Sequence, residues 1–393
     1  MSKTKNGNGH AGSGVFGSPD RVLVKRGLAE FRSGRPVMFS SPNKFLIALP
    51  VDGLDAARLH AFEHLCAPAT PKLVVTARRA RALGVESAGP IALKLPRGAD
   101  AAVIFSLVAD ADSEESVLPE GPADECAAAA IELAKIAQRL PALLVAEMVS
   151  PAHALIEPPL VVVASDAVMK FRREDIHSLE IAGEAMVPLQ GGLSTRFVVF
   201  RDAVGGGSVA VIVGKPDFSK PVPVRLHSSC LTGDVFGSRR CDCGDQLRIA
   251  LKRLNEEGGG VILYLEQEGR GLGLANKMRA YALQDDGLDT VDANTTLGFD
   301  DDERDYGIAA RMLQQLNCTR VLLLTNNPAK LDGLTEAGIE VVGRKPLHAP
   351  INVHNRRYMT AKAMRAGHKL DHLMIALADA DVPTVVRAAE QVP

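Results

Sequence analysis

The spacing of hydrophobic and polar residues predicts regular structure along most of this chain. Apolar residues recur at helical spacing in residues 20–34, and this pattern stops at Gly34. Residues 125–140 are rich in Ala, Leu, Glu and Lys, which favour a helix. The stretch 36–51 predicts a pair of strands, and ALLVAEMV at 142–149 predicts a buried strand. Residues 19 to about 175 therefore combine helices and strands.

The pattern changes near residue 175. Two β-branched runs joined by a glycine-rich turn in residues 194–216 predict a hairpin. Strands predicted at 259–267 and 320–328 then alternate with helices predicted at 273–287 and 303–317. We expect an α/β (mixed α+β) protein of two domains, with the boundaries 1–18 for a disordered tail, 19–175 and 176–372 for the domains, and 373–393 for a C-terminal tail.

Composition narrows the class of protein. The 393 residues are 46% hydrophobic and 23% charged, and the formal net charge is −2. That balance is typical of a globular protein and gives no bulk cationic field for nucleic acid or a membrane surface. The sequence has no tryptophan, and we find no run of about 18 apolar residues that could span a bilayer. The first 20 residues have no apolar segment typical of a signal peptide, so we expect a cytoplasmic protein without nucleic-acid or membrane partners.

Three of the six cysteines lie within LHSSCLTGDVFGSRRCDCGDQL, residues 226–247. Cys230, Cys241 and Cys243 have the spacing C-x10-C-x-C. Clustered cysteines in a reducing compartment more often bind metal than form disulfides. Three thiolates leave one tetrahedral position of Zn²⁺ open, which is typical of a catalytic site whose bound water has a pKa lowered to about 7.

Two other interpretations of this cluster stay open. His227, three residues before Cys230, could complete a closed structural zinc site. Alternatively, the three cysteines could bind no metal. The remaining cysteines, Cys66, Cys126 and Cys318, are scattered singly, and we expect them to be buried as small hydrophobic residues.

Three further stretches carry polar residues near strand or helix ends. YLEQEGRGLGLANKMRAY, 264–281, runs from a strand through a glycine-rich turn into a helix, and such a turn with Arg270 suits an anion or serves as a plain tight turn. TNNPAK, 325–330, follows a strand, so its threonine and lysine could meet a ligand there or form an exposed Asn-Pro turn. DDERDY, 301–306, places Asp302 and Arg304 at a predicted helix start, where acids also suit the helix dipole.

Taken together, these stretches resemble the GTP cyclohydrolase II family over residues 180 to about 372. The matching segments are RLHSSCLTGDVFGSRRCDCGDQL, QEGRGLGLANKMRAYALQDDGLDTVDAN, LGFDDDERDYGIAA, LLTNNPAK and TAKAMRAGHKL, in the order and at the spacing of that family. The resemblance implies hydrolytic opening of the guanine imidazole ring of GTP, with release of formate and pyrophosphate, as the first step of riboflavin synthesis. It also implies a homodimer and Mg²⁺ on the phosphates.

The resemblance assigns roles to individual residues. It implies that one Zn²⁺ is held by Cys230, Cys241 and Cys243, that Arg304 acts at the α-phosphate, that Asp302 accepts a proton and that Tyr281 acts near the ring. Because guanidinium is almost always protonated, Arg304 suits charge stabilisation better than nucleophilic attack. A carboxylate suits the N1–H and 2-amino group of guanine, which favours Glu268 for that contact. The implied GTP contacts are Arg225, Leu226, His227, Ser228, Ser229, Gln246, Glu268, Gly269, Arg270, Thr290, Thr325 and Lys330.

Two residues depart from the pattern of the family. Ser229 stands where the family usually has Glu, and Glu266 stands where it usually has Arg. If Glu266 faces the triphosphate, the reversed charge weakens GTP binding, whereas a solvent-facing Glu266 is neutral. These departures keep two alternatives open: a ring-opening hydrolase of another nucleotide, as in uracil catabolism, or a nucleotide-binding pseudoenzyme.

The N-terminal half resembles a degenerate 3,4-dihydroxy-2-butanone 4-phosphate synthase. GLAEFRSGRPV and AAIELAKIAQRLPALLVAEMV carry this resemblance. The acidic metal-binding cluster of that family is missing, because MFSSPNKFLIALP contains no acid, and DECA replaces its Gly-His-Thr stretch. Of the acidic residues only Glu147 persists. Since Mg²⁺ needs several oxygen ligands, we expect this half to have no synthase activity and to serve as a scaffold or a dimer-forming domain.

Overall fold

The computed structural model describes residues 17–42, 44–113, 116–148, 157–175 and 178–365. The expected N-terminal tail up to residue 16 and the expected C-terminal tail lie outside these residues. The chain divides into two compact units. The first unit contains the residues up to 176 together with 275–286 and 292–303, and the second contains 177–274, 287–291 and the residues from 304 onward. Two segments of the C-terminal half of the sequence therefore belong to the first unit.

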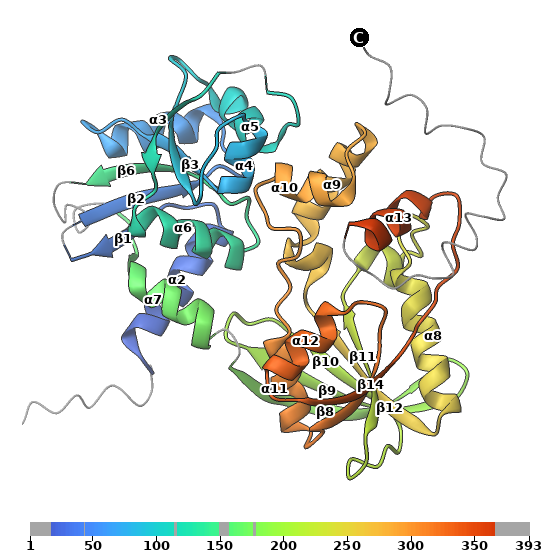
Figure 1. The fold of residues 1–393 in the computed structure, drawn as a ribbon. Coiled ribbons are helices and arrows are strands. Elements are labelled where there is room, and N and C mark those ends of the chain that lie inside the picture. Colours follow the sequence, from blue (N-terminus) through green and yellow to red (C-terminus); the bar gives the residue numbers. More distant parts are fainter. Residues whose placement is uncertain (1–16, 43, 114–115, 149–156, 176–177, 366–393) are drawn as a thin grey trace, which may run out of the picture. The chain divides into compact units, whose positions relative to one another are not determined.

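The first unit is built on a mixed sheet that Figure 1 shows in blue to green. Its strand order is β5-β4-β3-β6-β2-β1-β7, and every neighbouring pair is antiparallel except β1 and β7. The strands are β1 Val37–Ser41, β2 Lys44–Pro50, β3 Lys72–Val75, β4 Ile91–Lys94, β5 Leu118–Pro122, β6 Ala142–Met148 and β7 Val162–Ala164. The helices are α2 Pro19–Arg32, α3 Ala56–Cys66, α4 Ala77–Ala82, α5 Ala101–Ala109, α6 Glu125–Ile136, α7 Ser165–Lys170 and the short π-helix η2 Phe171–Asp175, with most of α9 Leu274–Asp285 and of α10 Thr290–Thr296 from later in the chain.

The second unit has a seven-stranded mixed sheet with the order β14-β13-β11-β12-β10-β9-β8. The parallel pairs are β12–β11, β11–β13 and β13–β14. The antiparallel pairs are β8–β9, β9–β10 and β10–β12. The strands are β8 Leu179–Leu189, β9 Leu193–Asp202, β10 Val209–Gly214, β11 Val222–Ser228, β12 Gly259–Leu265, β13 Arg320–Leu324 and β14 Glu340–Lys345. The helices are η3 Leu231–Val235, α8 Cys243–Glu256, η4 Glu268–Gly271, α11 Gly307–Gln315, α12 Ala329–Glu336 and α13 Arg356–Met364.

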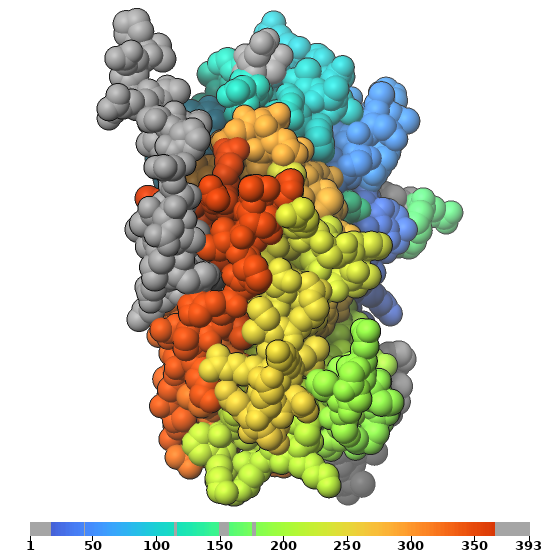
Figure 2. All heavy atoms as spheres, turned by 90° about the vertical axis from the view of Figure 1, so that its right-hand side faces the viewer, coloured from blue at the N-terminus to red at the C-terminus, as the bar shows by residue number. Residues whose placement is uncertain are grey.

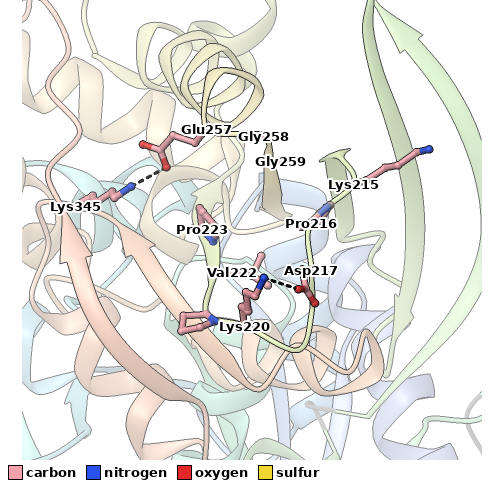
Figure 3. Close-up of a pocket in the computed structure, with 11 residues that line it drawn as sticks. Lys215, Pro216, Asp217, Lys220, Val222, Pro223, Glu257, Gly258, Gly259 and Lys345 are labelled. Atoms are coloured by element: carbon pink, nitrogen blue, oxygen red, sulfur yellow. Dashed lines mark hydrogen bonds and ion pairs between the residues drawn. The ribbon is translucent and has the colours of Figure 1, made fainter.

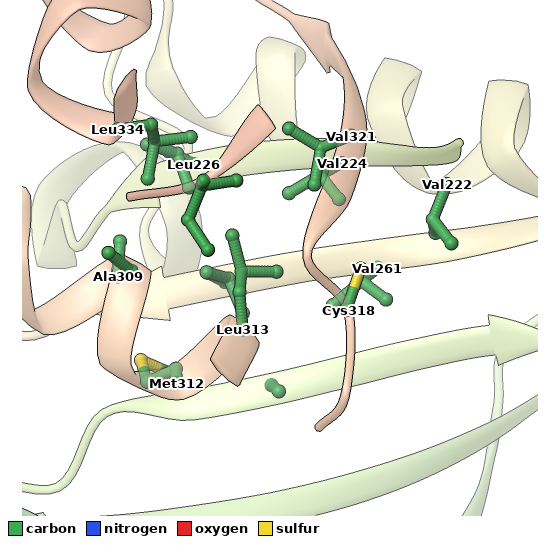
Figure 4. Packing of buried hydrophobic residues seen from close by; sticks show 14 of the residues in the cluster. Val222, Val224, Leu226, Val261, Ala309, Met312, Leu313, Cys318, Val321 and Leu334 are labelled. Atoms are coloured by element: carbon green, nitrogen blue, oxygen red, sulfur yellow. The ribbon is translucent and has the colours of Figure 1, made fainter. Parts of the chain in front are cut away.

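The two faces of the second sheet bury alternate residues of its strands. Ala210 and Ile212 of β10 belong to a core formed with α11 and α12, which Figure 4 shows around Met312 and Leu313. Val211 and Val213 belong to the opposite core, which α8 covers with Ala250 and Leu254. This alternation follows from the period of two in a strand. The sheet is therefore covered on both faces and forms the middle of three layers.

The expected fold class and the elements on which it rested are confirmed. Helices α2 and α6, the pair β1 and β2, and the hairpin β9–β10 lie where the hydrophobic pattern predicted them. The single cysteines Cys66, Cys126 and Cys318 are buried, as expected. One expectation is wrong: α11 begins at Gly307, so Asp302 and Arg304 lie in the preceding loop and not at a helix start. None of the described helices is long and apolar enough to cross a membrane.

Candidate metal and nucleotide site

Three polar loops follow the carboxyl ends of neighbouring parallel strands in the second unit. Strands β11 and β12 pair so that Ser228 lies opposite Leu265, and β13 joins the other side of β11. The loops that follow contain Cys230, the glycine-rich turn 268–273, and the segment 325–330. Ligands of open α/β sheets usually bind at this edge. The topology therefore gathers at one edge most of the residues that the motifs singled out.

Hydrogen bonds join these three loops. The Leu231 N–H donates to a carboxylate oxygen of Glu268 at 2.6 Å. The Ser229 N–H donates to the carbonyl of Leu265 at 2.8 Å. The ammonium of Lys330, which is buried, donates to the carbonyl of Leu226 at 2.7 Å. Lys330 is therefore not the exposed turn residue that one interpretation of TNNPAK allowed, and it places a positive charge beneath the end of β11.

The three clustered cysteines converge. Their sulfur atoms all lie within 4.8 Å of one another, and the Sγ atoms of Cys230 and Cys241 are 3.7 Å apart. Cys230 and Cys241 are buried, and Cys243 is half-buried at the start of α8. Among the described residues this is the one group of three or more metal-ligating side chains that gathers closely enough to hold an ion.

Two glycines permit this approach of the sulfur atoms. A Cβ on Gly233 would lie 2.9 Å from Sγ of Cys241 and 3.1 Å from Sγ of Cys230. A Cβ on Gly244 would lie 2.2 Å from the carbonyl oxygen of Gly233, which is closer than backbone packing allows. Because the first contacts are with sulfur atoms on short side chains and the second is with a backbone carbonyl, larger residues at these positions would push the cysteine loop apart.

The electrostatics of the cluster favour a bound cation. The hydrogen bond with the Cys230 thiol and burial raise the pKa of Cys241 to about 11, and the neighbouring sulfurs raise the pKa of Cys243 well above its usual value. Three buried thiols so close together would stay protonated unless a cation offset the charge of their thiolates. Thiolates are soft ligands that select Zn²⁺ over Mg²⁺ or Ca²⁺. The donor set therefore fits a zinc ion.

His227 does not join the cysteines. Its Nε2 atom lies 3.1 Å from both carboxylate oxygens of Asp234, and its ring stacks on Tyr264 with centroids 5.6 Å apart. Asp234 also accepts hydrogen bonds from the Tyr264 hydroxyl at 2.9 Å and from the Cys230 N–H at 2.9 Å. Burial lowers the pKa of His227, so the ring is neutral and donates to Asp234. Its role is to orient Asp234, which in turn fixes the backbone at the first cysteine.

A second polar network supports the other two cysteines. Asp242, between them, is 1% exposed and accepts hydrogen bonds from the Lys362 ammonium at 2.7 Å and from the Gln246 amide at 2.5 Å. Gln246 in turn accepts a hydrogen bond from the guanidinium of Arg225. In Figure 2 the red-orange atoms of the last described residues lie beside the yellow atoms of the segment that includes α8. Helix α13 therefore anchors the turn that carries Cys241 and Cys243.

The glycine-rich turn after β12 has an unusual backbone. Gly269 and Arg270 both have φ of 63°, a left-handed conformation that is strained for arginine. The N–H groups of Gly271 and Gly273 donate to the backbone carbonyls of residues 267 and 268, as in the plain tight turn that was one of the two interpretations. The turn is therefore internally closed, and the side chain of Arg270 is what it offers to an anion.

The remaining predicted residues are divided between the units. Tyr281 on α9 and Asp302 belong to the first unit, whereas Thr290 and Arg304 belong to the second. The Lys277 ammonium lies 5.6 Å from the ring centroid of Tyr281, and the Arg304 guanidinium lies 5.9 Å from that of Tyr306. Buried Thr325 accepts a hydrogen bond from the Asn327 N–H at 3.0 Å.

Comparison with known proteins identifies the family. The profile of GTP cyclohydrolase II matches residues 180–346. A GTP cyclohydrolase-2 from Azospirillum brasilense is 41% identical over 359 residues, which cover 88% of this chain and 93% of that protein. This chain belongs to the GTP cyclohydrolase II family. A second relative of the same name, from Xylella fastidiosa (strain 9a5c), is 39% identical and covers 91% of this chain.

Relatives of the GTP cyclohydrolase II family differ in how much of this chain they match. A GTP cyclohydrolase-2 from Azotobacter vinelandii is 49% identical over 196 residues, which cover 50% of this chain and 94% of that protein. The crystal structure of RibBX, a two-domain 3,4-dihydroxy-2-butanone 4-phosphate synthase from A. baumannii, is 15% identical with a TM-score of 0.32. It covers 83% of this chain and 99% of that protein.

The two departures from the cyclohydrolase II pattern have different surroundings. Glu266 is exposed, and its carboxylate accepts the Gly207 N–H at 2.5 Å across the turn between β9 and β10. Asp202 holds the same turn by accepting the N–H groups of Val204 and Gly206. Ser229 is half-buried and adjoins the first cysteine. Glu266 thus holds a turn of this chain, and Ser229 is the departure that adjoins the cysteine cluster.

Sequence reasoning missed several residues that build the cyclohydrolase site. Asp234, Tyr264 and Asp242 lie within or beside the quoted motifs, but their buried hydrogen bonds give no signal in the sequence. Lys362 lies within TAKAMRAGHKL, 120 positions from its partner Asp242. The sequence could have suggested these residues only because they are polar and lie in or beside the motifs. Their hydrogen-bond partners are known only once the chain is folded.

One described surface pocket is separate from the cysteine cluster. Figure 3 shows this pocket, of about 490 Å³, at the starts of β11 and β12. Four of its charged groups form pairs, with Lys345 2.8 Å from Glu257 and Lys220 3.2 Å from Asp217. The cysteines follow the opposite end of β11, so this pocket takes no part in the metal site.

Proposed function

We propose that this protein hydrolyses GTP, opening the imidazole ring of guanine with release of formate and pyrophosphate to give 2,5-diamino-6-(5-phosphoribosylamino)pyrimidin-4-one, the first step of riboflavin synthesis. The observation that carries the proposal is the convergence of three cysteines at the carboxyl edge of the sheet in a chain of the cyclohydrolase II family. Hydrolysis breaks both bonds from C8 to the ring nitrogens, so C8 leaves as formate.

In this proposal Cys230, Cys241 and Cys243 hold one Zn²⁺, which would supply Lewis acidity and activate water for attack at C8. The Nε2 atom of His227 is hydrogen-bonded to Asp234 and does not join the sulfur atoms, which supports a three-sulfur site with an open fourth position. Asp234 orients the loop that carries Cys230, and Asp242 orients the turn that carries Cys241 and Cys243. The chemistry therefore relies on an ion held by residues of the second unit alone.

We assign the nucleotide contacts by chemistry. Arg270 and Arg304 are the cations that face the triphosphate, where Mg²⁺ also binds, and Arg304 stabilises charge that develops at the α-phosphate. Asp302 accepts a proton, and Tyr281 acts near the ring. Glu268 binds the N1–H and 2-amino group of guanine through its carboxylate oxygens. The other proposed contacts are Arg225, Leu226, His227, Ser228, Ser229, Gln246, Gly269, Thr290, Thr325 and Lys330.

Buried polar atoms near the strand ends support a polar ligand. The Nε atom of Arg225, the Nδ1 atom of His227 and the hydroxyl of Ser228 have no hydrogen-bond partner among the residues that the structure describes. Buried polar atoms are rarely left unpaired, and those that are call for a functional explanation. Three such atoms on consecutive or near-consecutive residues of one strand support β11 as part of the nucleotide site.

The direct test is formate release. Purified protein with GTP, Zn²⁺ and Mg²⁺ should release formate and pyrophosphate and form a pyrimidine that absorbs in the ultraviolet. Cys241→Ser should abolish turnover while the protein stays folded, and Cys318→Ser, which alters a buried cysteine outside the cluster, should keep it. A zinc-loaded protein that releases no formate from GTP would contradict the proposal.

Ser229 keeps one alternative substrate class under test. Because this residue replaces the usual Glu beside a metal ligand, a panel of nucleotides should include uracil nucleotides. We expect GTP to be preferred. Ring opening of a uracil nucleotide in preference to GTP would assign the chain to another branch of the family, and nucleotide binding without turnover would make it a pseudoenzyme.

We further propose that the N-terminal half lacks synthase activity and that the enzyme acts in the cytoplasm as a homodimer. Glu147, the residue retained from the acidic cluster of the synthase family, forms an ion pair with Lys44 at 2.6 Å. Asp124 pairs with the same lysine at 2.7 Å. These ion pairs occupy carboxylates that a Mg²⁺ ion would need.

A further inference from the structure

The segment 292–303 lies in the cyclohydrolase match but belongs to the first unit. It is followed at once by Arg304, and it contains Asp302. It is therefore the segment on which two of the proposed catalytic residues depend for their position. The residues that hold it come from the N-terminal half of the chain.

Helix α4 and its N-cap fix the middle of the segment. The Thr76 hydroxyl donates to the carbonyl of Gly298 at 2.6 Å, and the Arg79 guanidinium donates to the carbonyl of Thr296 at 2.9 Å. Arg79 is 1% exposed and also donates to the carbonyls of residues 106, 107 and 110. A buried guanidinium with all its bonds to carbonyls holds them at fixed spacing.

The close approach at Gly298 admits no side chain. Its φ is +87°, and a Cβ would lie 3.0 Å from the hydroxyl oxygen of Thr76 and 3.2 Å from Cγ of Pro141. The backbone of the segment therefore rests directly on the N-terminal half, in a left-handed conformation that favours glycine.

Helix α6 fixes the end of the segment. The ammonium of Lys135 lies 2.7 Å from the carboxylate of Glu303 and 3.3 Å from that of Asp300. The side chains of Lys135 and Glu303 are only 11% and 10% exposed, so solvent screens this pair little. Glu303 stands between Asp302 and Arg304, and this ion pair therefore fixes the chain at the residue between them.

Hydrogen bonds to Asp305 also hold the chain on the other side of Arg304. The Gln267 amide donates to the carbonyl of Asp305 at 2.6 Å, and the Gly307 N–H donates to the Asp305 carboxylate at 2.8 Å. The chain is thus held on one side of Arg304 at residue 303, by Lys135 of α6, and on the other side at residue 305, by Gln267.

We infer that the N-terminal half acts in the cyclohydrolase reaction as a positioning domain, with Lys135 and Arg79 as positioning residues for the loop that carries Asp302 and Arg304. This inference rests on the proposed function. It assigns a present role to a domain whose own synthase chemistry we propose is lost. A displacement of catalytic groups by about 1 Å can lower turnover about 100-fold, so an anchor of this kind is sufficient to matter.

The test compares Lys135→Met with Lys44→Met in the full-length protein. Lys44 also pairs with two carboxylates of the first unit, Asp124 and Glu147, but it does not contact the 292–303 segment. After the wild-type protein has been shown to release formate from GTP, we expect Lys135→Met to lower kcat at least about tenfold with KM changed less than about twofold. Lys44→Met should leave both unchanged, and Lys135→Arg should restore most of the loss.

Two further measurements separate positioning from simple destabilisation. Amide hydrogen exchange in residues 292–303 should quicken in Lys135→Met and not in Lys44→Met, while zinc content stays equal. Glu303→Gln should lower kcat as Lys135→Met does, and the double variant should be no worse than either single variant. Wild-type kcat in a folded Lys135→Met protein would overturn the inference, whereas a wild-type protein without formate release would overturn the proposed function instead.

Discussion

Beside the cysteine cluster, two buried carboxylates fix the backbone that carries the cysteines. Asp234 accepts the N–H of Cys230, and Asp242 lies between the other two cysteines. Each carboxylate is in turn fixed by groups from distant parts of the chain, Tyr264 and Lys362. The geometry of the metal site therefore depends on residues outside the metal-binding motif.

Lys362 provides the sharpest test at this scale. Lys362→Met would leave the carboxylate of Asp242 buried without its cation, which should lower the free energy of unfolding by about 3 kcal/mol and reduce zinc content. Urea unfolding and metal analysis measure the two effects. Lys362→Arg should retain most of both, and Lys252→Met, at an exposed lysine of α8, should change neither. Full zinc content in Lys362→Met would show that α13 does not support the cysteines.

Spacing in the sequence was sufficient to find the three cysteines, because C-x-C brings two thiols together locally. It was not sufficient to decide between an open site and a closed one. That decision depends on where the His227 ring points, and its partner Asp234 is defined only when β11 and η3 are folded. Lys362 could not be paired with Asp242 from the sequence for the same reason.

At the scale of elements, hydrophobic period and turn residues predicted part of each sheet, including β1, β2 and β6 of the first and β9, β10, β12 and β13 of the second. These signals work where one face of an element is buried and the other is not, as in β10 and α6. They fail in the loop 300–306, where charged residues looked like the first turn of a helix. The structure uses those charges for ion pairs and backbone contacts instead, and α11 starts only at Gly307.

The turn between β9 and β10 gives a prediction for Glu266. Glu266→Ala removes the acceptor of the Gly207 N–H, which should lower the free energy of unfolding by about 1 kcal/mol. We expect the KM for GTP to stay unchanged, because the carboxylate faces this turn. Urea unfolding and steady-state kinetics measure the two quantities. A lower KM in the variant would show that Glu266 repels the triphosphate.

At the scale of the whole molecule, the sequence families and the compact units do not coincide. The cyclohydrolase match is continuous from 180 to 346, whereas two segments inside it belong to the first unit. The compact units are defined by contacts between residues that lie far apart in the sequence, and a sequence motif does not record such contacts. The relative from Azotobacter vinelandii aligns with only 50% of this chain, so the inferred positioning role would not extend to every member of the family.

Removal of the metal tests whether the site and the fold are separable. A strong chelator should abolish formate release. The far-ultraviolet circular dichroism should change little, because both cores of the second sheet are apolar and neither includes the three clustered cysteines. Added Zn²⁺ should restore activity more fully than added Mg²⁺. Unfolding of the protein on chelation would instead make the ion a structural element.

The hydrogen bond from the Thr76 hydroxyl to the Gly298 carbonyl has an evolutionary consequence. Cutting the chain between its two sequence families would take the Thr76 hydroxyl from the Gly298 carbonyl and the Arg79 guanidinium from the Thr296 carbonyl, and water would have to replace both donors. Under the inferred positioning role, substitutions in α4 would be selected against through the turnover of GTP.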